Sequence, residues 1–114
     1  MIIAQNVEMN KAKLLSQLEI LSTLFTDDYY KNDRNRNDGS NYSIRYEFGS
    51  KYIKIIKHYW GSSSVAGFIV NSHNAKFPYG TLLKAASYKA PALNFSRGNI
   101  FELQNRTFAW TGIN

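Results

Sequence analysis

The sequence contains no cysteine and only two histidines among its 114 residues. Without cysteine there is no disulfide, thiolate zinc site, iron–sulfur cluster or cysteine nucleophile. The two histidines, His58 and His73, do not show the HxxxH or HExxH spacing, so the usual ligands of zinc are almost missing. We therefore expect neither a metal nor a cofactor.

Catalytic motifs are missing as well. The sequence has no G-x-S-x-G elbow, no phosphate-binding P-loop and no G-x-G-x-x-G. Outside residues 26–41 the carboxylates are few, which argues against a hydrolase with paired carboxylates. They are Glu8, Glu19, Glu47 and Glu102. We predict that the protein is not an enzyme.

No apolar run approaches the roughly 18 residues that a membrane-spanning helix needs. Residues 1–8 also lack the basic and apolar regions of a signal peptide, so we expect a cytoplasmic protein without membrane contact. The hydrophobic content of 44% is high enough for a buried core. At this length we expect one domain over residues 1–114.

Negative charge is nearly absent from residues 42–100, where Glu47 is the one acidic residue against eight basic ones. The other six basic and seven acidic residues nearly cancel, so the net charge of +6 comes from this region. The eight basic residues are Arg45, Lys51, Lys54, Lys57, Lys76, Lys84, Lys89 and Arg97. A surface of one sign attracts polyanions or acidic protein surfaces.

The first predicted element is an amphipathic helix that ends near Phe25. Its apolar residues recur at steps of three and four: Leu14, Leu15, Leu18, Leu21, Leu24 and Phe25. We expect this stripe to pack on a sheet, and its alternative use is a homodimer or partner face. The polar segment Thr26–Asn41 is predicted to be a mobile loop, or a loop that becomes ordered on a partner.

The spacing then changes to a period of two, which predicts strands. Tyr42–Phe48 alternates cleanly, Gly49-Ser50 forms a hairpin turn, and Lys51–Trp60 returns. Because the returning strand carries apolar and lysine side chains on both faces, we expect an edge strand or strong twist. Val65–Val70 is predicted to be a central strand, in which Gly67 indicates a bulge or a close backbone approach.

The second half is predicted to contain two further short strands, at Thr81–Leu83 and Arg106–Trp110. Between them, Lys84–Ile100 is rich in small residues, which favours a compact loop with one helical turn against the sheet. The predicted fold class is α+β, with the N-terminal helix packed on a small antiparallel sheet of about four or five strands.

Several short motifs occur in a fixed order between Tyr52 and Phe101. They are S-V-A-G-F at 64–68, G-x-x-x-K-A-A-S at 80–87, K-A-P-A at 89–92 and R-G-N at 97–99. This order resembles a group of uncharacterised small proteins from tailed bacteriophages, many of which have Trp where Tyr88 stands. The resemblance implies a viral origin, a bacterial host cytoplasm and a small α+β domain, and it transfers no active site.

Lysine and arginine interleaved with aromatic rings are typical of nucleic-acid surfaces. The candidate binding residues are Arg45, Lys51, Lys54, Lys57, Tyr59, Trp60, Lys76, Lys84, Lys89 and Arg97. No RNP motif, KH loop or helix-turn-helix is present, so we predict nucleic-acid binding without strong sequence preference. The alternative is a protein-binding inhibitor of a host defence or nuclease complex, similar to an anti-CRISPR protein. It would hold an acidic protein or ribonucleoprotein surface through Arg97, Tyr59 and Trp60.

Overall fold

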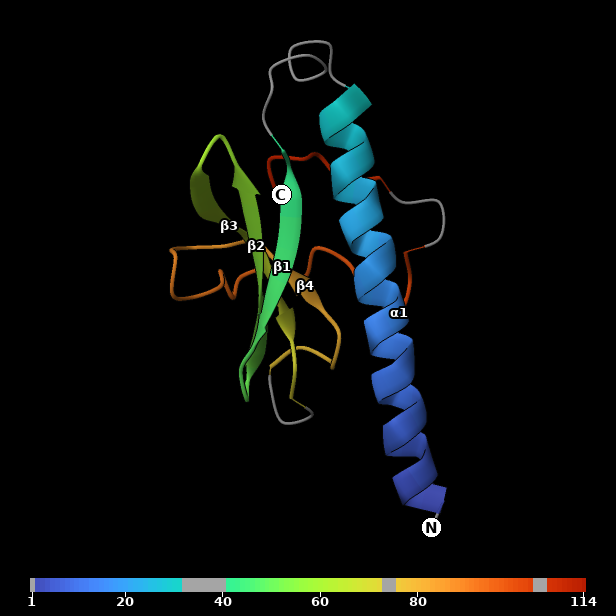
Figure 1. The fold of residues 1–114 in the computed structure, drawn as a ribbon. Helices are drawn as coiled ribbons and strands as arrows, with labels where there is room; N and C mark the ends of the chain where they lie inside the picture. Colours follow the sequence, from blue (N-terminus) through green and yellow to red (C-terminus); the bar gives the residue numbers. More distant parts are fainter. Residues whose placement is uncertain (1, 32–40, 73–75, 104–106) are drawn as a thin grey trace.

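The computed structural model describes residues 2–31, 41–72, 76–103 and 107–114, with side chains from Lys11 onward (Figure 1). One helix is followed by an antiparallel sheet in the order β1-β2-β3-β4, which is also the chain order. The elements are α1 (Ile2–Lys31), β1 (Ser43–Phe48), β2 (Tyr52–Tyr59), β3 (Ser62–Val70) and β4 (Leu82–Leu83). The predicted α+β fold, a helix packed on an antiparallel sheet, is confirmed.

Helix α1 extends beyond the predicted end at Phe25. The buried positions Leu14, Leu18, Leu21 and Phe25 continue at the next four-residue step to Tyr29, which is 0% exposed. The prediction of a loop over Thr26–Asn41 is therefore wrong for its first six residues, which are helical. The remainder at 32–40 lies outside the described residues. Charged and polar residues in this last stretch of the helix obscured the apolar stripe.

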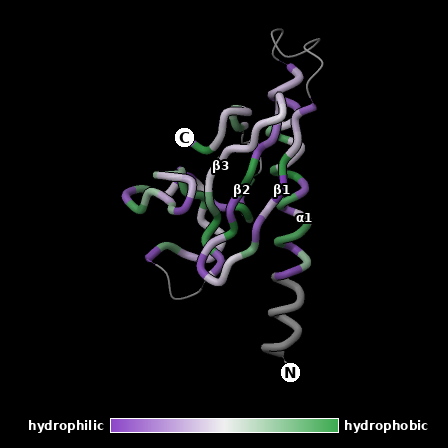
Figure 2. The backbone as a smooth tube through the Cα atoms, turned by 60° about the vertical axis from the view of Figure 1, so that its left-hand side comes forward, coloured by the Kyte–Doolittle hydropathy of each residue, from purple (hydrophilic) through white to green (hydrophobic). Residues whose placement is uncertain are grey.

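The buried part of the predicted stripe packs on one face of the sheet, as expected, but Leu15, which was included in the stripe, is 47% exposed. Figure 2 shows hydrophobic and hydrophilic residues alternating along α1, which runs beside β1. Hydrogen bonds add to this packing: the Tyr46 hydroxyl lies 2.7 Å from the Leu18 carbonyl and 2.8 Å from Ser22 Oγ, and Gln17 Nε2 donates to the Ile100 carbonyl. Burial raises the pKa of Tyr46 to about 12, because the charged phenolate would lose its water.

Strand β2 lies between β1 and β3, so its predicted place at the sheet edge is wrong. Its lysines follow strand alternation, with Lys54 opposite Glu47 and Lys57 opposite Ile44. Lys54 and Lys57 therefore project from opposite faces of the sheet. The pairing with β1 continues without a shift through Ile55 and Ile56, which therefore project from opposite faces of the sheet, and both side chains are buried.

Strand β3 is central, as predicted, although it begins three residues before Val65. The connection from β2 is a two-residue turn in which Trp60 and Gly61 have φ of 54° and 71°. Positive φ at both positions is the geometry of a tight hairpin that matches strand twist. Trp60 is thus in the turn and not in the strand, and its side chain is 62% exposed.

Gly67 combines both features that the sequence left open, a bulge and a close backbone approach. Ile55 pairs with Gly67 and Ile56 with Val65, so Ala66 is the extra residue of a β-bulge. The Ala66 carbonyl accepts a hydrogen bond of 2.7 Å from the amide of Ile113. A Cβ at Gly67 would lie 2.6 Å from Ile113 Cγ1, so only glycine lets the C-terminal segment lie this close.

The C-terminal segment does not form the predicted last strand. Residues 107–110 are irregular, while Arg106 lies outside the described residues. Their backbone groups bond elsewhere: the Trp110 amide donates to Asp28 Oδ2 at 2.8 Å, and the Ile113 amide bonds to the bulge. This segment packs with α1 on the same face of the sheet, where Phe108 and Trp110 join the main core.

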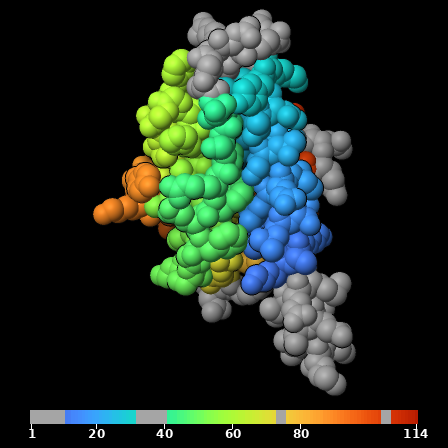
Figure 3. All heavy atoms as spheres, viewed as in Figure 1, coloured from blue at the N-terminus to red at the C-terminus, as the bar shows by residue number. Residues whose placement is uncertain are grey.

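The opposite face of the sheet, here called the outer face, is partly covered by the outer loop, residues Lys84–Arg97. Thr81 and β4 precede it as expected, but no helical turn forms anywhere in residues 84–100. The loop is held by a bridge between Ala85 and Pro91 and by the amide of Ala92 on the Lys84 carbonyl. In Figure 3 it projects, in orange, on the side away from α1.

Replacing Tyr29 with alanine is expected to lower the free energy of unfolding by about 3–5 kcal/mol, because a fully buried aromatic side chain is lost. Urea denaturation measures the change. The matched control is Tyr88→Ala, since Tyr88 is 53% exposed and should cost much less. Equal costs for the two variants would show that the end of α1 is not packed as described.

Replacing Gly67 with alanine is expected to destabilise the fold by roughly 1–3 kcal/mol, because the new methyl group meets Ile113 and the Leu83 carbonyl. Part of this cost should disappear in an Ile113→Ala background, where the nearest atom is absent. Ser64→Ala, an exposed position on the same strand, is the control. A neutral Gly67→Ala variant would argue against the close approach of the C-terminal segment.

Candidate nucleic-acid interface

The ten candidate residues do not lie on one surface. Arg45 and Lys54 project from the outer face, while Lys57 and Tyr59 project toward α1. Lys57 Nζ donates to the Thr111 carbonyl, and burial lowers its pKa. Tyr59 packs within 5.9 Å of Tyr29 and 5.2 Å of Trp110, measured between ring centroids. Neither residue contributes to a surface on the outer face.

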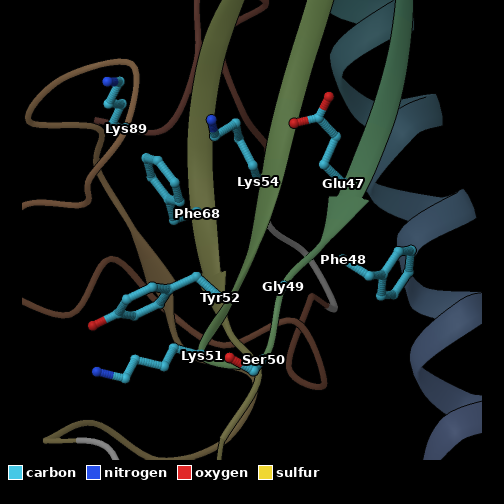
Figure 4. A pocket seen from close by; sticks show the side chains of 9 residues that line it. All are labelled: Glu47, Phe48, Gly49, Ser50, Lys51, Tyr52, Lys54, Phe68 and Lys89. Atoms are coloured by element: carbon cyan, nitrogen blue, oxygen red, sulfur yellow. The ribbon is translucent and has the colours of Figure 1, made fainter.

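The outer face carries an open hollow beside the β1–β2 hairpin, which we call the hairpin hollow. Its volume is about 410 Å³. Figure 4 shows Lys51, Tyr52, Lys54 and Phe68 pointing to the same side of the hairpin, whereas Phe48 points toward α1. The residues that line it are Glu47, Phe48, Gly49, Ser50, Lys51, Tyr52, Lys54, Phe68 and Lys89.

The outer loop is tied to β2 beside this hollow. Lys54 Nζ lies 4.2 Å from the centroid of the Tyr88 ring, which is a cation–π distance. Lys89, the next residue, reaches the hollow from the loop. Behind it, Phe68 is buried and meets Tyr52 edge-on at 6.2 Å between centroids. Two segments far apart in the chain therefore contribute lysines to the same hollow.

A second hollow, the Leu93 hollow, lies beside the first and shares Lys51 and Tyr52 with it. Its volume is about 420 Å³ and it is more enclosed. Lys76 Nζ donates to the Leu93 carbonyl at 3.1 Å, which joins the outer loop to the segment after β3. The lining residues are Lys51, Tyr52, Val70, Ser72, Lys76, Phe77 and Leu93.

Together the two hollows form what we call the basic aromatic surface. It contains four lysines of the predicted set, Lys51, Lys54, Lys76 and Lys89. Glu47 is the acidic residue that lines it, and this carboxylate is already paired with Arg45 at 2.8 Å. The surface therefore has a positive field with aromatic rings between the charges.

The other predicted residues lie elsewhere. Trp60 is exposed in the β2–β3 turn, at the opposite end of β2 from Tyr52. Lys84 is exposed but lines neither hollow. Arg97 is half-buried, with its guanidinium 5.4 Å from the Phe95 ring. The structure thus separates these three side chains from the basic aromatic surface.

The list of ten candidates left out four residues that line or contact this surface: Tyr52, Phe77, Tyr88 and Leu93. Tyr88 is 53% exposed, and its contact with Lys54 depends on where the outer loop lies. Phe77 and Leu93 carried no usable signal in the sequence, since their approach depends on how the outer loop folds back over the end of β3.

The chain belongs to a family of unknown function, DUF7717, whose model matches residues 2–114. No curated protein and no solved structure is significantly similar to it. Within the described part of the chain, no helix has the length and apolar character to cross a bilayer. In the same residues no group of three or more His, Cys, Asp or Glu side chains is placed to hold a metal ion.

The amine of Lys57 is expected to titrate below the ordinary lysine value of 10.5, because burial disfavours its charged form. A side-chain NMR titration measures this, with the resonance assigned from a Lys57→Arg variant. An amine that titrates at or above 10.5 would place Lys57 in solvent, and hence available to a ligand after all.

Proposed function

We propose that the protein binds single-stranded nucleic acid on the basic aromatic surface, without strong sequence preference. The observation that carries this is the convergence of four lysines from three separate segments around Tyr52: two on β2 or beside it, Lys76 after β3, and Lys89 in the outer loop. A polyanion is the ligand that matches such a set of like charges.

The aromatic rings favour a single strand over a duplex. Bases in a duplex are already stacked on each other, whereas a single strand can stack its bases on protein rings. Tyr88 is 53% exposed beside Lys54, and Tyr52 is partly exposed between the two hollows. Because every base has a stacking face, contacts of this kind carry little sequence preference.

The alternative, a protein partner held by Arg97, Tyr59 and Trp60, receives less support from the structure. Interface anchors of this kind normally cluster in one buried patch. The Arg97 amide donates to the Leu82 carbonyl, and Leu82 lies level with Ile53 of β2 across the sheet. Tyr59 lies six residues further along β2. This is a separation of roughly 20 Å at strand spacing. A bacteriophage origin belongs to this proposal through the sequence resemblance, and a cytoplasmic location through that resemblance and the lack of a signal-peptide pattern in residues 1–8.

Short single-stranded DNA and RNA oligonucleotides are expected to bind at low salt, with affinity that falls steeply as salt is added. In the triple variant Lys51→Gln, Lys54→Gln and Lys89→Gln, the salt slope should fall by about 0.7 for each lost phosphate contact. Fluorescence anisotropy over a salt series measures both quantities.

The matched control carries the same change in net charge at the helix: Lys11→Gln, Lys13→Gln and Lys31→Gln, all of which are exposed. Equal losses in the two triple variants would mean a diffuse charge effect without a site. Absence of binding to any oligonucleotide at low salt would disprove the proposal and return attention to a protein partner.

A further inference from the structure

The Leu93 hollow differs from its neighbour in chemistry. Its walls are largely apolar, formed by the side chains of Val70, Phe77 and Leu93, and Tyr52 separates it from the hairpin hollow. Leu93 is 44% exposed although it is apolar. Lys51 and Lys76 also line the hollow, so a ligand must combine a flat or apolar group with negative charge.

We infer that the Leu93 hollow holds one unstacked nucleobase of a bound single strand, while the phosphates on either side of this base contact Lys51 and Lys76. The inference rests on the proposed function and deepens it, because it assigns a base subsite within the basic aromatic surface. The volume of about 420 Å³ lies within the range of about 300–1,000 Å³ found for small-molecule sites.

The position of the charges favours a nucleotide over an uncharged apolar ligand. Lys76 is held by the Leu93 carbonyl, so its ammonium group stays at the wall of the hollow and does not extend freely into solvent. Lys51 contributes from the end of the β1–β2 hairpin. Two cations beside an apolar pocket, one of them held in place, match an aromatic base attached to a phosphate backbone.

This arrangement also accounts for a preference for single strands. A base within a duplex must first be unpaired and unstacked before it can enter a pocket, and this costs free energy. A base in a single strand has no partner to lose. Lys54 and Lys89, at the neighbouring hairpin hollow, would then contact the next phosphates along the strand.

The test compares oligothymidylate of about ten nucleotides with an abasic oligonucleotide of the same length and phosphate charge. The wild-type protein should bind the abasic strand about tenfold more weakly. In a Leu93→Trp variant, the indole fills the hollow and the difference between the two strands should shrink. Leu15→Trp is the matched control, because Leu15 is 47% exposed on α1, and it should keep the wild-type ratio.

Each outcome decides a separate point. Equal binding of the two strands by the wild type would overturn the base subsite, and base stacking on Tyr52 and Tyr88 with it, and would leave phosphate binding by the lysines as the part of the proposed function that stands. A ratio that persists in a folded Leu93→Trp variant would place base contacts outside this hollow and also overturn it. No binding of either strand would mean that the proposed function itself has failed. The wild-type comparison needs no variant, so equal binding of the two strands would overturn the subsite even if Leu93→Trp did not fold.

Discussion

The ring of Tyr29 lies where the last turns of the helix, the first two strands and the C-terminal segment meet. It stacks on Tyr42 of the segment entering β1 at 4.6 Å between centroids, and meets Trp110 edge-on at 5.2 Å. Tyr59 of β2 closes the group at 5.9 Å. Segments from both ends of the chain therefore depend on one buried side chain for their relative position.

Hydrogen bonds fix how the residues of this aromatic cluster are oriented relative to one another. The Tyr42 hydroxyl donates to the Trp110 carbonyl at 2.7 Å, and the Trp110 amide donates to Asp28 on α1. Burial is the main reason that the pKa of Tyr42 is raised, so its hydroxyl keeps the proton that it donates. Aromatic rings can pack at several relative positions, so it is these hydrogen bonds that set the position of the C-terminal segment. In this position the amide of Ile113 donates to the Ala66 carbonyl at the bulge.

The helix and C-terminal segment use one face of the sheet, which leaves the other to the outer loop. The large apolar side chains of this loop, Tyr88, Leu93 and Phe95, are exposed, so they do little to hold it in place. Its contacts to the rest of the protein include two lysines, Lys54 on the Tyr88 ring and Lys76 on the Leu93 carbonyl. The same side chains line the hollows, so the residues that position the outer loop also give the surface its charge.

The sequence predicted the elements that have a regular apolar period: the helix, the first hairpin and the central strand. It failed where a residue's role depends on distant partners. Tyr29 lies in a stretch of charged residues and is buried only because Tyr42, Tyr59 and Trp110 surround it. A strand was predicted at Arg106–Trp110 in the C-terminal segment, but the Trp110 amide bonds to the Asp28 side chain on α1 and the Ile113 amide to the bulge at Ala66.

For the candidate site, the sequence identified a region rich in positive charge without assigning its members to a face. Strand alternation alone would separate Lys54 from Lys57, but Ile55 and Ile56 between them are both apolar, so the sequence did not show which face of the strand is covered. Once the sheet is known, the separation has a physical consequence. The ammonium group of Lys57 donates a hydrogen bond to the Thr111 carbonyl within the fold, and burial lowers its pKa. The lysines that line the two hollows remain at the surface of the outer face, where a phosphate backbone could reach them. The positive charge available to a ligand is therefore concentrated on one side of the protein.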